Sequence, residues 1–206
     1  MAARTRRTLI DIAKRRQKPG SGSLSLSPDT MAGMQWPDLG EDLGDLPWAV
    51  VGAVATRLYV AERATSDLDA VVLAKDARRA ENRLKAAGFT QTGKLSVGGT
   101  SWLSPDNITV DLIYGSDDWW PAALQAASGN HDQQGLPVLP LPYLVMMKLL
   151  AGRTIDVGDV TRMLGAAGDE ALQEVRGVTK TNAPHLAEDL ESLIALGKLE
   201  FQSPDS

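Results

Sequence analysis

The apolar pattern of the chain changes once, near Gly135, and this change limits the folds that the chain can adopt. Before it, short apolar and β-branched runs alternate with segments of helical spacing and with turn residues. Beyond it, apolar residues recur at intervals of three and four only, which predicts helices alone. We therefore expect an α+β fold with a front lobe that contains a sheet and a back lobe made of helices.

The same pattern predicts the individual elements and segments. The expected strands are 47–52, 68–73, 94–103 and 107–114. The expected helices are 53–62, 76–87, 142–150, 157–164, 169–176 and 184–196. The chain divides into a basic N-terminal segment with a flexible linker (1–33), a core (34–135) and a helical C-terminal lobe (136–206).

Charge is distributed unevenly along the chain. The 206 residues carry a net charge of −5, yet residues 1–18 hold seven lysines and arginines against the single acid Asp11. A basic end on an acidic body favours contact with a polyanion. Two other interpretations stay open: a solvated tail, or a short helix with Leu9, Ile12 and Ala13 on one side, which is marginal unless it docks.

Several classes of site are excluded by what the sequence lacks. There is no cysteine, so disulfides, thiolate metal sites and a cysteine nucleophile are excluded, and only His131 and His185 are available for a histidine zinc centre. No apolar stretch is long enough for a membrane span or a secretory signal. We expect a cytoplasmic protein with no membrane partner.

Acidic residues at three positions carry the strongest chemical signal. Asp67 and Asp69 are two residues apart at the start of an expected strand, so both side chains leave the same face. Asp111 has hydrophobic neighbours in another expected strand, although a strand-end residue that caps a turn is the alternative. Neighbouring carboxylates repel unless a cation lies between them, and oxygen-only ligands favour Mg²⁺ or Mn²⁺. Such a trio suits two-metal phosphoryl-type transfer.

A glycine upstream of the acids marks a bend between a strand and a helix. At Gly52, free backbone N–H groups and a helix N-terminus would hold the phosphates of a nucleoside triphosphate, and a side chain would obstruct their approach. We name five candidate nucleotide-binding residues: Gly52, Ala53, Thr56, Arg63 and Lys148. The alternative for Lys148 is an amine that extends to water, and Arg57 faces either phosphate or solvent.

These motifs resemble those of the nucleotidyltransferase superfamily with the DNA polymerase beta-like fold. Its signature, a hydrophobic residue, Gly, Gly or Ser, a gap and Asp-hydrophobic-Asp-hydrophobic, matches Val51-Gly52-Ala53 and Asp67-Leu68-Asp69-Ala70. Ala53 departs from the signature, because no hydroxyl is available there, and Ala70 is a small hydrophobic. Neither departure removes an acid, so the resemblance implies a small mixed sheet with flanking helices and a metal site on Asp67, Asp69 and Asp111.

Within this superfamily, Arg63-Ala64-Thr65-Ser66-Asp67-Leu68-Asp69 resembles the version found in AbiEii-like and mycobacterial toxin–antitoxin toxins. Lys148 and the following Arg153, Asp156 and Asp159 resemble their lysine-bearing helix, so the resemblance spans about 48–164. It implies transfer of a nucleoside monophosphate from a nucleoside triphosphate to a hydroxyl, with Mg²⁺ or Mn²⁺. It also implies the 3′ end of tRNA as acceptor, and a toxin role with a cognate antitoxin.

Two alternatives to that function stay open. The acceptor of the same chemistry is a small molecule, as in aminoglycoside-modifying relatives, or the chain is a non-catalytic nucleotide-binding module. A tRNA acceptor predicts affinity that falls steeply with salt. Arg153, Asp156 and Asp159 either contact substrate or form ion pairs within the lobe, and Trp119-Trp120 either stacks on a base or lies in the core.

Overall fold

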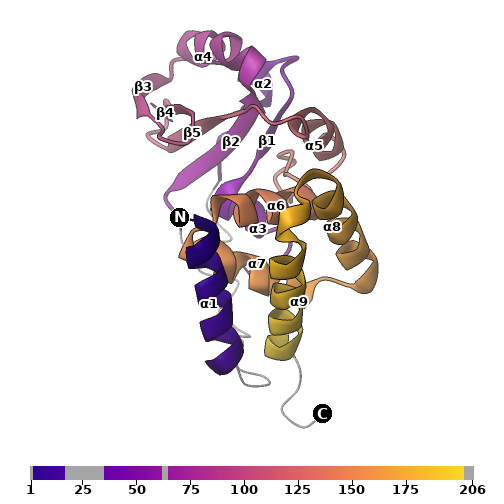
Figure 1. Ribbon diagram of the computed structural model, residues 1–206. Coiled ribbons are helices and arrows are strands. Elements are labelled where there is room, and N and C mark those ends of the chain that lie inside the picture. The colour runs from indigo at the N-terminus through magenta and orange to yellow at the C-terminus, as the bar shows by residue number, and fades with distance from the viewer. Residues whose placement is uncertain (1, 17–34, 62–64, 202–206) are drawn as a thin grey trace. The chain divides into compact units, whose positions relative to one another are not determined.

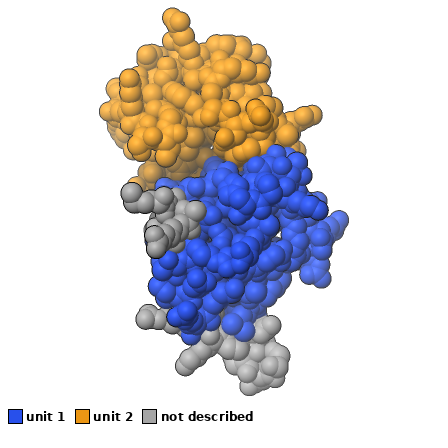
Figure 2. Space-filling view, viewed as in Figure 1, with its two compact units in different colours: residues 1–28, 59–61, 141–206 blue, residues 29–58, 62–140 orange. Residues whose placement is uncertain are grey.

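The computed structural model describes residues 2–16, 35–61 and 65–201 (Figure 1). The chain divides into two compact units, shown in different colours in Figure 2. We call residues 29–58 and 62–140 the sheet unit, and residues 1–28, 59–61 and 141–206 the helical unit. The mixed sheet of the first and the helices of the second confirm the predicted α+β fold class.

The sheet unit contains a five-stranded mixed sheet with the order β1-β2-β5-β4-β3. Its strands are β1 (Trp48–Val50), β2 (Asp67–Leu73), β3 (Thr90–Lys94), β4 (Gly99–Leu103) and β5 (Thr109–Gly115). The central pair, β2 and β5, is parallel, and the other neighbours are antiparallel. The parallel pairing places the beginnings of β2 and β5 side by side, in the register Asp69 opposite Asp111.

One face of this sheet is covered by α4 (Ala77–Ala86), which follows a short 3₁₀ turn, η2 (Ala74–Asp76). Tyr114 on β5 donates a 2.6 Å hydrogen bond to Glu81 of α4, and Lys85 lies 5.9 Å from the ring centre of the buried Trp102. Burial, followed by the bond to Glu81, raises the pKa of Tyr114 to about 12. Because side chains alternate along a strand, Tyr114 and Asp111 point to opposite faces. The helix α4 therefore lies on the face away from Asp111.

Two predicted elements of the sheet unit differ from the structure. The expected strand 94–103 is part of a hairpin, because Gly98 and Gly99 have φ values of 90° and 145° and turn the chain between β3 and β4. The expected helix 53–62 is only α3 (Gly52–Thr56). It is followed by turn residues, and the hydroxyl of Thr56 donates to the carbonyl of Ala53 at 2.6 Å. The unit also contains α2 (Gly40–Leu43) and α5 (Trp120–Ala127).

The helical unit is built from longer helices. They are α1 (Ala2–Arg16), α6 (Leu141–Ala151), α7 (Thr154–Ala166), α8 (Asp169–Asn182) and α9 (Ala187–Phe201), with a 3₁₀ turn η3 (Pro184–Leu186) before α9. The helix α7 packs on α9, α6 packs on α7 and α8, and α1 packs on α9 and α7. Among the described residues, no helix is both long and apolar enough to cross a bilayer.

The basic N-terminal segment enters the helical unit as a helix. Of the interpretations that the sequence left open, the docked helix is the one found for residues 2–16. Ile10 is fully buried, and the buried Arg6 donates to Asp189 Oδ2 at 2.6 Å and to the carbonyl of Leu149 at 2.8 Å. Arg7 also donates to Asp189, at 3.2 Å. The predicted linker, 19–28, lies outside the described residues.

Candidate metal centre

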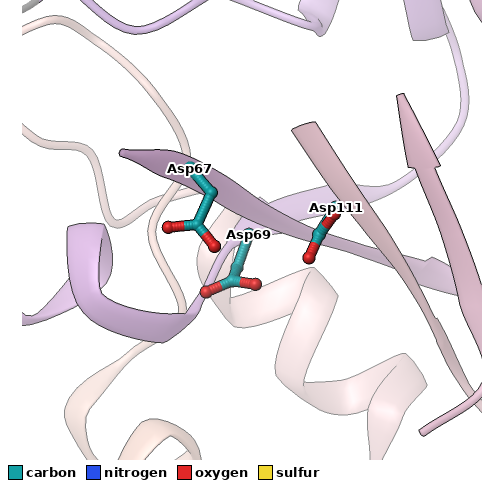
Figure 3. A group of neighbouring side chains, drawn as sticks. All are labelled: Asp67, Asp69 and Asp111. Carbon is teal, nitrogen blue, oxygen red and sulfur yellow. The ribbon is translucent and has the colours of Figure 1, made fainter. Parts of the chain in front are cut away.

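Three carboxylates meet at the beginnings of β2 and β5 (Figure 3). Asp67, Asp69 and Asp111, which we call the triad, each offer an oxygen atom, and these oxygens all lie within 4.8 Å of one another. All three side chains are half-buried. The two-residue spacing puts Asp67 and Asp69 on one face of β2, and the parallel register brings Asp111 beside Asp69 on the same face. The convergence therefore follows from strand geometry and not from a loop.

Electrostatics favours a cation within the triad. Two unit charges 4.8 Å apart repel by about 3 kcal/mol at an effective dielectric constant of about 20. A hydrogen bond to a charged group contributes about 1.5–3 kcal/mol, which is less than the summed repulsion of three such pairs. A divalent cation would convert this repulsion into attraction, and an all-oxygen donor set suits Mg²⁺ or Mn²⁺.

One atom of the triad provides an independent test of this fit. Among the residues that the structure describes, Asp111 Oδ1 is buried and has no hydrogen-bond partner. A buried carboxylate oxygen without a partner is costly, and native structures rarely keep one without a reason. An ion held by the triad would satisfy it. The residues present therefore fit a divalent cation.

Gly52 lies against Asp69. The glycine has φ of +66°, and a Cβ built on it would lie 1.8 Å from Asp69 Oδ2. The backbone N–H of Val51 also donates to the Asp69 carbonyl at 2.9 Å. Any side chain at position 52 would thus collide with the Asp69 carboxylate. The sequence indicated that this glycine leaves space for a phosphate. In the structure, the carboxylate of Asp69 lies in that space.

The other predicted residues of α3 are held by the protein. Ala53 is buried, and the hydroxyl of the buried Thr56 donates a hydrogen bond to the Ala53 carbonyl. Arg57 donates from Nε to Asp132 Oδ2 at 3.1 Å and from Nη2 to Gln134 Oε1 at 2.8 Å. Arg57 is therefore half-buried and pairs with a nearby loop, so the solvent interpretation does not describe it, and contact with phosphate stays a prediction.

Sequence reasoning missed the contacts that this loop makes. Besides Arg57, the carboxylate of Asp132 accepts the N–H groups of Gln134 and Leu136, at 2.8 and 3.0 Å. The loop then joins β1, since Val50 donates to the Pro137 carbonyl at 2.7 Å. An aspartate followed by polar residues and a glycine is a turn signal that was present in the sequence. No sequence signal indicated that Asp132 would pair with Arg57, which lies 75 residues earlier in the chain.

Two predicted phosphate contacts do not belong to the described part of the sheet unit. Arg63 falls outside the described residues. Lys148 belongs to the helical unit, where it is 1% exposed and donates from Nζ to Asp159 at 2.8 Å and to Asp156 at 3.5 Å. Arg153 donates to the same Asp156 at 2.6 Å. Of the two roles predicted for Arg153, Asp156 and Asp159, the structure therefore shows ion pairs within the helical unit. The buried amine of Lys148 does not extend to water.

The tandem tryptophans lie in the core of the sheet unit. Trp119 and Trp120 are 8% and 5% exposed, and their rings stack with centres 4.0 Å apart. A Cβ on Gly115 would lie 2.6 Å from the Trp120 ring, so this glycine provides the space for it. Of the two roles considered, the structure therefore supports the core packing role.

Comparison with known proteins gives structural likeness at low identity. No protein-family model matches the chain, and no curated protein sequence matches it. The solution structure of the antibiotic-resistance factor ANT(2'')-Ia is similar at 14% identity and a TM-score of 0.45, over 77% of this chain and 85% of that chain. A crystal structure of ANT(2")-Ia with adenylyl-2"-tobramycin is 18% identical, with a TM-score of 0.43, over 77% and 91% of the two chains.

A third similar structure is terminal uridylyl transferase 4 from Trypanosoma brucei with bound GTP. It is 13% identical, with a TM-score of 0.35, over 97% of this chain and 70% of that chain. By their names, these neighbours are a terminal uridylyl transferase and an antibiotic-resistance factor, the latter in one structure in complex with adenylyl-2"-tobramycin. A likeness at these TM-scores does not assign a function to this chain. The assignment of a function depends on the geometry of the triad instead.

Proposed function

We propose that this protein is a divalent-metal-dependent nucleotidyltransferase that moves a nucleoside monophosphate from a nucleoside triphosphate to a hydroxyl acceptor. The observation that carries the proposal is the triad: three carboxylates on two parallel strands, with oxygens within 4.8 Å and one buried oxygen without a partner among the described residues. A bound Mg²⁺ or Mn²⁺ would supply charge neutralisation for the triphosphate and its pyrophosphate leaving group.

Residues of the sheet unit have separate roles in the transfer step. The acceptor oxygen forms a bond to the α-phosphorus, and the bond from that phosphorus to the pyrophosphate oxygen breaks. Asp67 and Asp69 hold the cation, and Asp111 completes the site through its unpartnered Oδ1. The other carboxylate oxygen of Asp111 polarises the acceptor hydroxyl and accepts its proton. The backbone N–H groups that follow Gly52 hold phosphate oxygens without a side-chain hydroxyl, since Ala53 has none.

Thr56, Arg63 and Lys148 remain predictions as nucleotide contacts. The hydroxyl of Thr56 and the amine of Lys148 already have partners in the protein. The contribution of Thr56 and Arg63 to nucleotide binding is measured by the KM for the triphosphate in Thr56→Val and Arg63→Gln variants. In our proposal, the backbone after Gly52 makes the main phosphate contact.

For the acceptor we propose the 3′ end of tRNA, and for the biological role a toxin with a cognate antitoxin. This part of the proposal is supported by the resemblance around Arg63–Asp69 described above and by the basic residues 1–18. Lysine and arginine contacts to phosphate release counterions and strengthen binding at low salt. An aminoglycoside acceptor would show little dependence on these residues.

The direct test is label transfer from each α-labelled triphosphate, with Mg²⁺, to tRNA or to an aminoglycoside. We expect label on one acceptor with the wild type and a loss of about 10²–10³-fold in Asp69→Asn, because removal of one electrostatic stabiliser commonly costs this factor. Asp106→Asn, in an exposed turn of the same unit, is the matched control and should transfer normally. Undiminished transfer by Asp69→Asn would refute the proposal, and transfer only to an aminoglycoside would refute the tRNA acceptor.

A further inference from the structure

One residue outside the triad touches it directly. The hydroxyl of Thr65 donates a 2.6 Å hydrogen bond to Asp67 Oδ1, in a half-buried setting. Thr65 precedes β2 and is two residues from Asp67. A carboxylate oxygen at this distance is a strong, charge-assisted acceptor. The bond fixes the rotation of the Asp67 carboxylate about its terminal torsion, which is otherwise broad.

Asp67 is the member of the triad that the sheet holds least. Asp69 and Asp111 lie within their strands, with Asp69 paired to Asp111 and Asp111 paired to Ser101 on its other side. Asp67 is the first residue of β2 and pairs with β5, whereas the Asp69 carbonyl also accepts the N–H of Val51 at 2.9 Å. Without another contact, repulsion from the two neighbouring carboxylates would turn the Asp67 side chain away from them.

We propose that Thr65 is a positioning residue that keeps Asp67 oriented for the divalent cation, an inference that rests on the proposed function. An ionised carboxylate has about four lone-pair directions, so it can accept the Thr65 hydroxyl and bind a cation together. Groups that hydrogen-bond to metal ligands typically contribute 10–100-fold in metal affinity or activity. The hydroxyl therefore acts on the cation through Asp67 and makes no contact with substrate.

The experiment is a Mn²⁺ titration of the full chain, read by the electron paramagnetic resonance of free Mn²⁺. We expect the Kd of Thr65→Val to rise at least 10-fold, while Thr65→Ser, which keeps the hydroxyl, binds like the wild type. Thr90→Val makes the same change on the exposed edge strand β3 and should leave the Kd unchanged. Thermal unfolding without metal should show that all four proteins are folded at the temperature of the titration.

A second measurement separates positioning from a loss of folding. The label-transfer rate of Thr65→Val should recover toward the wild-type rate as Mn²⁺ is raised, with a higher half-activating concentration. A Kd for Thr65→Val equal to that of the wild type would overturn the inference and leave the proposed function standing. So would a reduced rate that no Mn²⁺ concentration restores. Failure of the wild type to bind Mn²⁺ would overturn both proposals.

Discussion

At the scale of single residues, the site depends on close contacts that only small or short side chains allow. Gly52 is the clearest case, because its α-carbon faces Asp69 and its φ is +66°. A residue with a side chain is disfavoured there twice, by the collision with the carboxylate and by the left-handed backbone. Thr65 adds the complementary contact at Asp67. Two of the three triad members thus lie against a residue that is not an acid.

Gly52→Ala should damage both stability and metal binding. The new Cβ would begin 1.8 Å from Asp69 Oδ2, so Asp69 must leave the triad, and the strained backbone costs about 1–3 kcal/mol. We expect the free energy of unfolding in urea to fall by that amount and the Kd for Mn²⁺ to rise more than 10-fold. Gly93→Ala is the control, since no described atom lies within 4 Å of its Cβ position. Wild-type Mn²⁺ affinity in Gly52→Ala would contradict this account of the glycine.

At the scale of elements, the helical unit depends on a close crossing of two helices. A Cβ on Gly197 of α9 would lie 2.3 Å from the Thr161 carbonyl of α7 and 2.6 Å from the Gly165 N. A Cβ on Gly165 would lie 2.5 Å from the Gly197 carbonyl. The two glycines face each other, and their missing side chains allow the backbones of α7 and α9 to touch.

Gly197→Ala should therefore destabilise the helical unit, although alanine is the better helix former. Overpacking of this kind costs about 1–3 kcal/mol. Gly158→Ala, also in α7, has no described atom within 4 Å of the new Cβ, and there the helix propensity of alanine should stabilise by about 1 kcal/mol. Chemical unfolding of the two variants measures both effects. Equal shifts of the same sign would contradict the crossing.

The contact between α8 and α9 makes part of the free energy of unfolding depend on pH. Hydrogen bonding from Arg176, at 2.6 Å, lowers the pKa of Glu191 from its ordinary value of 4.5. A lowered folded-state pKa gives stabilisation that is fully present above pH 4.5 and is lost as pH falls through the folded value. For this exposed pair we expect at most about 1 kcal/mol. Arg176→Gln should lower the free energy of unfolding at pH 7, and the difference from the wild type should shrink as pH falls below 4.5. A difference that stays constant as pH falls would contradict the pairing.

Elements defined by local patterns were predictable, and contacts between distant residues were not. The helices after Gly135 and the strand β2 follow from apolar spacing, as does the stop at Gly88, whose φ is +90°. The turn at Gly98 and Gly99 was predicted as the interior of one strand, 94–103, which joined β4 to the last residue of β3. The remainder of β3 was not predicted. The spacing of Asp67 and Asp69 predicted their shared face, and the register of β2 with β5 supplied Asp111.

The neighbourhood of the triad shows why the remainder was not predictable. The collision of a Gly52 side chain with Asp69 and the pairing of Arg57 with Asp132 depend on tertiary placement. The same holds for Lys148, whose sequence context is equally compatible with water, phosphate or buried acids. The sequence shows which acidic and basic residues could pair, and the fold decides which of them meet.

At the scale of the whole molecule, the basic N-terminal segment has a structural role beside any role in binding RNA. Arg6 is buried with Asp189, and Lys14 donates to Ser192 at 3.1 Å. Deleting residues 1–18 would remove these contacts together with the exposed charges. A change in RNA binding after deletion would therefore mix a loss of stability with a loss of charge.

Single substitutions separate these two effects. Arg6→Ala leaves the buried Asp189 short of a partner and should cost about 3 kcal/mol of stability. Arg15→Gln, on an exposed part of α1, should change stability by less than about 0.5 kcal/mol. If α1 contacts tRNA, Arg15→Gln should also weaken binding and reduce the slope of log affinity against log salt by about one. An unchanged slope would exclude this position from the RNA-binding surface.

The central claim is that the triad holds a divalent cation beside the Gly52 bend. The most direct test is anomalous X-ray diffraction from a crystal grown with Mn²⁺ and a non-hydrolysable nucleoside triphosphate. The account predicts an anomalous peak within bonding distance of carboxylate oxygens of Asp67, Asp69 and Asp111, with triphosphate density next to Gly52. A crystal with ordered triphosphate whose Mn²⁺ lies elsewhere, or whose triad carboxylates coordinate nothing, would contradict it.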